Sequence, residues 1–289
     1  MKIIYHADDF GVTVEQSKSI LDCYKNGVLN SVSIIPNSAE MAESYELIRD
    51  LVDDGKIRAV VHLNFVEGPC MAAGGRDDVP HLVDAEGNFI CTYGSMLKLN
   101  YSGKKNEVRQ EFVEEIAAQI KAVVDVTGGK KISVDSHQHY LQIPMIWEAF
   151  CQVMENEDYE LEYLRNPVDP MGPVWSTPSM FWSVPKLNFV KWALLKFLAP
   201  NMQAFKAEGT KIPVFFGIPF TCQMTEERVR ALLPKYIKVA EKKGVDLELM
   251  FHPGAVRDIE KLMDASQADL VDFYGSEYRD REKETLCSI

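Results

Sequence analysis

Apolar residues along the chain fall into two patterns that alternate with one another. Short runs that are almost wholly apolar and end at polar or turn residues are typical of strands buried on both faces of a parallel sheet. Between them lie longer segments in which apolar residues recur every three or four positions, as in an amphipathic helix. The predicted strands are residues 3–6, 32–35, 58–63, 132–139, 161–165, 214–219 and 247–252.

The helical segments fill the intervals between these strands. Thr13 and Gln16 have the spacing of a capping box at the start of the first helix. Because strands that alternate with helices form parallel sheets, the chain belongs to the α/β class. Seven or eight such units favour a (β/α) barrel-like fold with mostly parallel strands, and the pattern leaves open whether an eighth strand closes it. Further helices are predicted at 39–52, 108–126, 144–155, 186–198 and after Thr225.

No repeat and no low-complexity linker divides the 289 residues, so we expect a single domain over 1–289. Two connections are longer than a strand and a helix require. Residues 64–105 form a long loop insertion, and 166–185 form a second loop rich in proline and tryptophan. Both follow the carboxyl end of a predicted strand, which is where barrel enzymes carry their active sites.

The charge and the cysteines exclude several classes of protein. With 43 acidic and 31 basic residues the net charge is -12, which argues against a nucleic-acid groove and against an anionic membrane surface. The six cysteines are scattered without a CxxC pair, so no thiolate metal site is expected. The chain opens directly on a strand without a signal-peptide pattern, and we expect a reduced, cytoplasmic protein. The sequence does not decide between a monomer and a homodimer.

Histidines gather at the carboxyl ends of the predicted strands. Taken singly, each is more often a structural residue than a ligand. Independent structural uses would not all fall on the same edge of one sheet, and a barrel brings the ends of distant strands together. Five of the six histidines have this position, namely His6, His62, His137, His139 and His252.

Two adjacent aspartates, Asp8 and Asp9, follow the first strand. Neighbouring carboxylates repel one another unless a positive charge lies between them, and a metal ion is the usual source of that charge. One carboxylate and two imidazoles form a common open site for a hydrolytic divalent metal. From the residues alone either aspartate could be the ligand, and the other would take a proton from the attacking water.

The segment Asp135-Ser136-His137-Gln138-His139 is the sharpest local pattern. If the strand continues to 139, alternation places Asp135, His137 and His139 on one face. A carboxylate beside an imidazole can fix its tautomer. His252, which precedes Pro253-Gly254, could donate a proton to a leaving amine or could be a turn residue, and the sequence weighs these two readings equally.

At these residues the sequence resembles the YdjC-like carbohydrate deacetylase family, which includes chitooligosaccharide deacetylases. A weaker match is "REKETL" at 281–286, which is similar to the R-x-x-E motif that members of the family carry near the C-terminus. The stronger matches span nearly the whole chain in order. They are "ADDFG" at 7–11, "VHLN" at 61–64, "DSHQH" at 135–139, "YLRNP" at 163–167, "FFGI" at 215–218 and "ELMFHPG" at 248–254.

The resemblance implies a barrel-like enzyme that binds one divalent metal ion, Mg²⁺ or Zn²⁺, and removes acetyl groups from N-acetylated sugars. It departs from the family at His6, where many members have asparagine. By analogy with polysaccharide deacetylases, Asp8 would be the base and His252 the acid. The implied metal ligands are Asp9, His62 and His137, and the implied substrate-facing residues are His139, Arg165 and Asp135.

Two other functions remain open at this point. A metal-dependent phosphoesterase would favour two metals and more charged groups at the strand ends than the sequence offers. A non-catalytic sugar- or metal-binding protein would not need the full set of acid, base and ligands. Trp175, Phe181 and Trp182 could stack on sugar rings or pack on the barrel rim or a dimer partner. The identity of the sugar, and whether it is phosphorylated, stays open.

Overall fold

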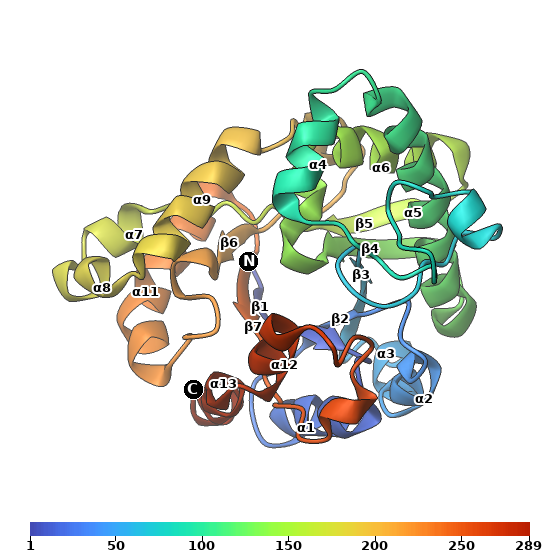
Figure 1. Cartoon of the computed structure of the whole chain (residues 1–289). Coiled ribbons are helices and arrows are strands. Elements are labelled where there is room, and N and C mark those ends of the chain that lie inside the picture. Colours follow the sequence, from blue (N-terminus) through green and yellow to red (C-terminus); the bar gives the residue numbers. More distant parts are fainter.

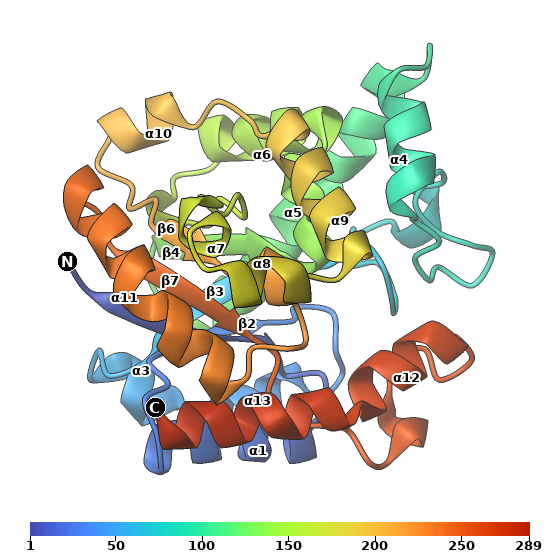
Figure 2. The same ribbon diagram turned by 90° about the vertical axis from the view of Figure 1, so that its left-hand side faces the viewer.

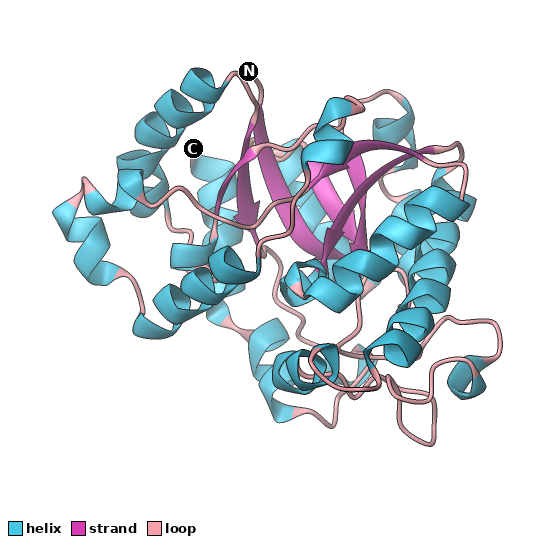
Figure 3. Ribbon diagram, turned by 90° about the horizontal axis from the view of Figure 1, so that it is seen from above, coloured by secondary structure: helices cyan, strands magenta, loops and turns pink.

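A computed structural model describes residues 1–289. Seven parallel strands form one sheet in the order β5-β4-β3-β2-β1-β7-β6. The sheet curls into a half-barrel with the helices on its outside (Figures 1 and 3). The predicted α/β barrel-like fold is therefore confirmed, and the barrel is open. The strands are β1 Ile3–Phe10, β2 Ser31–Ile34, β3 Arg58–Leu63, β4 Lys131–Ser136, β5 Glu160–Leu164, β6 Val214–Phe216 and β7 Leu247–Phe251.

The opening lies between the two edge strands, β5 and β6. One backbone bridge spans it, because Lys211 forms an isolated parallel bridge with Tyr163. Its backbone N–H donates to the carbonyl of Glu162 at 2.8 Å, and its carbonyl accepts from the N–H of Leu164 at 3.0 Å. One residue just before β6 thus takes the place in the ring that an eighth strand would have in a closed barrel.

Helices cover the outer face of the sheet, and α13 packs along α1 beneath the barrel (Figure 2). No helix combines the length and the apolar character that a membrane crossing requires. The helices are α1 Val14–Lys25, α2 Met41–Glu46, α3 Arg49–Asp53, α4 Tyr93–Asn100, α5 Lys105–Thr127, α6 Pro144–Asn156, α7 Gly172–Trp175, α8 Pro178–Ser183, α9 Lys186–Leu198, α10 Gln203–Ala207, α11 Glu226–Lys243, α12 Ala268–Gly275 and α13 Glu277–Ser288.

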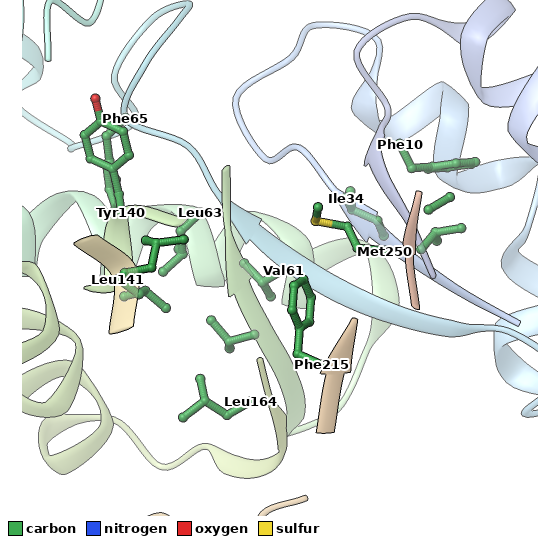
Figure 4. Close-up of a cluster of buried hydrophobic side chains, with 14 of the residues drawn as sticks. Phe10, Ile34, Val61, Leu63, Phe65, Tyr140, Leu141, Leu164, Phe215 and Met250 are labelled. Atoms are coloured by element: carbon green, nitrogen blue, oxygen red, sulfur yellow. The ribbon is translucent and has the colours of Figure 1, made fainter. Parts of the chain in front are cut away.

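One large apolar cluster joins the sheet to these helices. Figure 4 shows part of it, with Val61 and Leu63 of β3 and Phe215 of β6 among the buried side chains. Removing this much apolar surface from water is the main favourable contribution to folding. The half-barrel is therefore a rigid support for the polar side chains at its carboxyl edge.

The structure differs from the sequence prediction in a few elements. The helix expected at 39–52 is two short helices, α2 and α3, and the break between them lets Ile48 enter the core. Thr13 caps α1 by accepting the N–H of Gln16 at 3.1 Å, but the Gln16 side chain does not return the bond of a capping box. The Thr225 side chain forms no capping hydrogen bond at the start of α11. The insertion at 64–105 is not all loop, because it contains α4.

Candidate active site

The two aspartates lie inside β1, which runs four residues further than the sequence predicted. The pairing of β1 with β2 is irregular between Ala7 and Phe10, and Asp9 has a left-handed φ of 65°. Alternation along a regular strand would leave neighbouring side chains on opposite faces, whereas this irregularity brings both carboxylates into the barrel. Asp8 is 2% exposed and Asp9 is fully buried. Each carboxylate meets a different set of partners.

Asp9 lies between two histidines from different strands. Its Oδ1 is 3.1 Å from Nδ1 of His137 and 3.5 Å from Nε2 of His62. The three possible ligand atoms lie within 4.8 Å of one another. Ligands held at about 2.0–2.2 Å from a tetrahedral ion are roughly 3.4 Å apart, so the spacing suits a single cation.

The surroundings of His62 also fit a cation. Its Nδ1 is 2.6 Å from Oδ1 of Asp135, while its buried Nε2 faces Asp9 without a hydrogen-bond partner. Burial works to lower the pKa of His62, but Asp135 and Asp9 outweigh it and raise the pKa to about 10. The imidazole thus holds a proton that a cation could replace. A carboxylate behind a ligating histidine is the usual arrangement in metal sites.

The second carboxylate oxygen of Asp9 accepts hydrogen bonds from Arg279, a fully buried residue of α13. Both terminal nitrogens of Arg279 reach Oδ2, and the Nη1 distance is 3.3 Å. Burial alone would raise the pKa of Asp9, but Arg279, His137 and His62 hold it well below its ordinary value. Asp9 is therefore ionised, and its Oδ1 is directed at the two imidazoles.

Asp8 has a different partner, Arg165. Two nitrogens of Arg165 contact the two oxygens of Asp8 at 2.7 and 2.9 Å. The same guanidinium lies 2.9 Å from Asp135 and 2.7 Å from Glu248. Burial would raise the pKa of Asp8, but Arg165, His62 and His252 outweigh it and lower the pKa. Arg165 itself is 2% exposed, so the structure places this predicted substrate-facing residue among three carboxylates.

A second cluster with metal-ligand spacing consists of His6, Asp8 and Asp135. Its positive charge already comes from Arg165, which lies within 2.9 Å of both aspartates. Nε2 of His6 is 2.6 Å from the hydroxyl of Ser33, and that hydroxyl donates to Asp135 at 2.5 Å. Both carboxylates of this cluster therefore already have partners, and the Asp9 cluster is the better candidate for a cation.

His252 follows β7 and stands beside Asp8. Its Nε2 is 3.8 Å from Oδ2 of Asp8, and its Nδ1 is 3.7 Å from Oε2 of Glu282. The backbone N–H of His252 donates to the same carboxylate of Glu282 at 2.5 Å. Glu282 also accepts the N–H of Met224 at 2.9 Å, so it ties the segments after β6 and β7 together. His252 as a whole is 7% exposed.

The prediction that Asp135, His137 and His139 share one strand face is wrong. β4 ends at Ser136, and the chain then turns through Gln138 and His139, whose φ values of 49° and 64° are left-handed. The turn directs His137 to Asp9, whereas the His139 ring packs edge-on against Phe215 with centroids 6.2 Å apart. Strand alternation fails here because the backbone leaves the extended region.

His139 lies near a lysine of α9. Burial, Lys191 and Arg165 hold the pKa of His139 well below its ordinary value. The half-buried Lys191 forms no ion pair, and burial lowers its pKa against the attraction of Asp8. On the rim, Trp175 and Trp182 are 55% and 82% exposed, and Phe181 contacts Trp182 with centroids 5.0 Å apart.

Sequence reasoning missed several buried site residues. The R-x-x-E match was placed two residues late, because Arg279 and Glu282 face the site whereas Arg281 and Glu284 are exposed. The segment R-D-R-E-K-E at 279–284 contains both registers, so a signal was present. Glu67 had none: its Oε1 accepts the hydroxyl of Tyr274 from α12 and lies 3.7 Å from Nε2 of His137.

A cavity of about 470 Å³ lies elsewhere, at the amino ends of the strands. Its lining includes Lys2, Arg58 and Lys131, the residues at or next to the starts of β1, β3 and β4, and none of the residues around Asp8 and Asp9. Its size alone therefore does not identify the reaction site. The candidate site is chosen for its converging polar groups instead.

The family model described as YdjC-like protein matches residues 2–289. A carbohydrate deacetylase of Xenopus laevis is 27% identical over 265 residues, which are 88% of this chain and 81% of that protein. A chitooligosaccharide deacetylase of Yersinia enterocolitica is 25% identical over 61% of this chain and 64% of that protein. A solved structure from Enterococcus faecalis V583, provisionally described as a cellobiose-phosphate cleavage protein, has a TM-score of 0.63 at 21% identity. It covers 99% of this chain and 90% of that chain, and it shows the fold alone.

Proposed function

Because this chain belongs to the YdjC-like protein family, we propose that it is a metal-dependent hydrolase that removes the acetyl group from an N-acetylated sugar or chitooligosaccharide. Relatives that carry the names carbohydrate deacetylase and chitooligosaccharide deacetylase support the substrate class. The observation that carries the mechanism is the division of labour between two adjacent aspartates. Asp9 joins two histidines, and Asp8, held by Arg165, is not needed as a ligand.

Asp9, His62 and His137 would hold one divalent cation, Mg²⁺ or Zn²⁺. A cation held there would polarise the acetyl carbonyl and would lower the pKa of the attacking water below that of bulk water. The chain's own groups then have two tasks, which are to accept the proton of that water and to supply one to the leaving nitrogen.

Asp8 is the base in this proposal. Arg165 holds both of its oxygens and keeps it ionised, so the carboxylate is ready to accept a proton at neutral pH. A carboxylate of low pKa is a weak base, and it suffices because the water is itself made more acidic. In this scheme Arg165 positions Asp8, and Asp135 positions His62.

His252 is the acid. An amine leaves poorly unless it is protonated as the C–N bond breaks. Nε2 of His252 lies 3.8 Å from Asp8, so acid and base border the same space, and Glu282 fixes the backbone at His252. The water proton passes to Asp8, the nitrogen takes a proton from His252, and the products are acetate and the free amine.

The approach to the site supports a sugar that carries an anionic group, such as a phosphate. Lys191 is a half-buried cation without an ion pair, and Asp8 and His139 are within reach of its charge. We propose that His139 and Lys191 border the bound sugar on the α9 side. An anionic substituent would provide the counter-charge that Lys191 lacks in the protein.

Acetate release from a panel of N-acetylated sugars, free and phosphorylated, measured with and without a chelator, tests this function. We expect release that stops with chelator and returns with added Mg²⁺ or Zn²⁺. Release of inorganic phosphate without acetate would instead support the phosphoesterase. That alternative is weaker, because Arg165 already fills the second His/Asp cluster, where another metal would have to bind.

A further inference from the structure

We infer that Arg279, supplied by the last helix, is a positioning residue for the metal ligand Asp9. This inference rests on the proposed metal site. The two oxygens of Asp9 are divided between two sets of partners: Oδ1 faces His62 and His137, and Oδ2 is held by both terminal nitrogens of Arg279. The guanidinium thus leaves one oxygen for a cation and withholds the other.

The surroundings of Arg279 hold its guanidinium in place. Its side chain is fully buried and stacks on Phe273 and Tyr274, with the guanidinium carbon 4.7 and 4.9 Å from the ring centroids. The hydroxyl of Tyr274 in turn donates to Glu67, which faces Nε2 of His137 at 3.7 Å. Side chains of α12 and α13 therefore support two of the three proposed ligands. Arg279 contacts Asp9 directly, and Tyr274 acts on His137 through Glu67.

The chemistry explains why an arginine stands here. Two N–H groups on one carboxylate oxygen stop rotation of the carboxylate and favour one-oxygen ligation of the cation through Oδ1. A lysine carries the charge but not the planar fork, so it would restrain the carboxylate less well. Loss of a hydrogen-bonding partner behind a metal ligand commonly weakens metal binding about 10- to 100-fold.

A competing account assigns Arg279 the opposite effect. If the guanidinium repelled the cation or competed with it for Asp9, removal of Arg279 would tighten metal binding. The two accounts therefore differ in the sign of one measurable quantity, the change in metal Kd.

The last helix offers a matched control, Arg281. It lies two residues further along α13, is exposed, and contacts only its own helix, with Glu277 at 3.9 Å and the Tyr278 ring centroid 5.3 Å from its guanidinium carbon. Other contacts hold α13 when Arg279 is changed: Lys283 donates to Ser19 and Asp22 at 3.0 Å, and Glu282 accepts two backbone N–H groups. We therefore expect the helix to stay docked in the variants.

The experiment is calorimetric titration of Zn²⁺, and separately of Mg²⁺, into metal-stripped wild type, Arg279→Gln, Arg279→Lys and Arg281→Gln. Thermal unfolding without metal reports on the fold of each variant. We expect the Kd of Arg279→Gln to rise about 10- to 100-fold, that of Arg279→Lys to rise less, and that of Arg281→Gln to stay at the wild-type value. If Arg279→Gln does not fold, Arg279→Lys must still bind the metal with a higher Kd than wild type.

The possible failures can be told apart. Equal or tighter binding by the folded Arg279 variants, with normal binding by wild type, overturns the role of Arg279 and leaves the metal site standing. A lower melting temperature with an unchanged Kd would make Arg279 a structural residue only. Wild type that binds neither metal would contradict the proposed metal site, and the role of Arg279 would fall with it.

Discussion

Asp8 and Arg165 form a two-point ion pair inside the half-barrel, with nitrogen–oxygen distances of 2.7 and 2.9 Å. Asp8 lies in β1, and Arg165 directly follows the edge strand β5. Strands β4, β3 and β2 lie between these two strands in the sheet. This pair sets Asp8 apart from its neighbour Asp9, which faces two histidines instead. The proposed assignment of base and ligand follows from this separation.

The first prediction concerns the stability that Arg165 provides. Arg165→Met leaves Asp8, Asp135 and Glu248 buried without their shared counter-charge, and breaking a buried ion pair on one side typically costs about 3–5 kcal/mol. Urea unfolding should show a loss of at least this size. Arg58→Met is the control, because Arg58 pairs with no carboxylate and stacks on Tyr163. Equal losses in both variants would contradict the account.

The second prediction is a pH dependence of stability due to Asp169. This buried carboxylate accepts N–H groups of Gly217 and Ile218 at 2.9 and 3.1 Å, and burial raises its pKa to about 7. The folded state then binds more protons than the unfolded state between about pH 4 and 7. The contribution of Asp169 to stability is therefore full below this window and is lost as the pH rises through it.

Thermal unfolding between pH 5 and 8 checks this dependence. The melting temperature of wild type should fall with rising pH relative to that of Asp169→Asn, which cannot ionise. Exposed Asp77→Asn should follow wild type throughout. Parallel profiles for wild type and Asp169→Asn would mean that Asp169 does not titrate in this range.

How much of this structure the sequence predicts depends on how far apart along the chain the interacting residues lie. The strand at 58–63 and the helix at 186–198 match β3 and α9, because an apolar run and a helical period are local signals. The sheet edge that unites Asp9, His62 and His137 was likewise predictable from strand ends. The end of β4 at Ser136 was not, because left-handed residues after it depend on tertiary contacts.

The buried partners of these residues were harder to predict. Glu67 meets Tyr274 across 207 positions and Arg279 meets Asp9 across 270, and no spacing rule connects such pairs. Glu248 sits in an apolar strand, where the sequence gives no sign that its carboxylate pairs with Arg165. Such contacts are decided by packing of whole elements, and only the overlapping R-D-R-E at 279–282 gave a hint.

The third prediction concerns His252 as the proton donor. His252→Ala should lower kcat on an N-acetylated sugar by roughly 10²-fold or more, the size of a general acid contribution, with metal content unchanged. An ester with a good leaving group needs no protonation and should lose much less activity. Equal losses on the two substrates would give His252 a structural role.

The fourth prediction assigns Lys191 to an anionic substituent of the sugar. Lys191→Met should raise KM for a phosphorylated N-acetylated sugar much more than KM for its neutral counterpart, because only the former loses a charge partner. Lys196→Met is the control on the same helix, since Lys196 is exposed and lies over Trp192. A Lys191 variant with the same KM ratio as wild type would exclude this role.

The central claim is the division of roles between Asp8 and Asp9, and metal content together with turnover in two matched variants tests it most directly. Each of Asp8→Asn and Asp9→Asn removes one charge without changing shape. Elemental analysis after reconstitution, followed by an acetate-release assay, should show that Asp8→Asn keeps about one divalent ion per chain and loses most turnover, whereas Asp9→Asn loses the ion. Full metal occupancy in Asp9→Asn and loss of metal in Asp8→Asn would contradict the account and exchange the two roles.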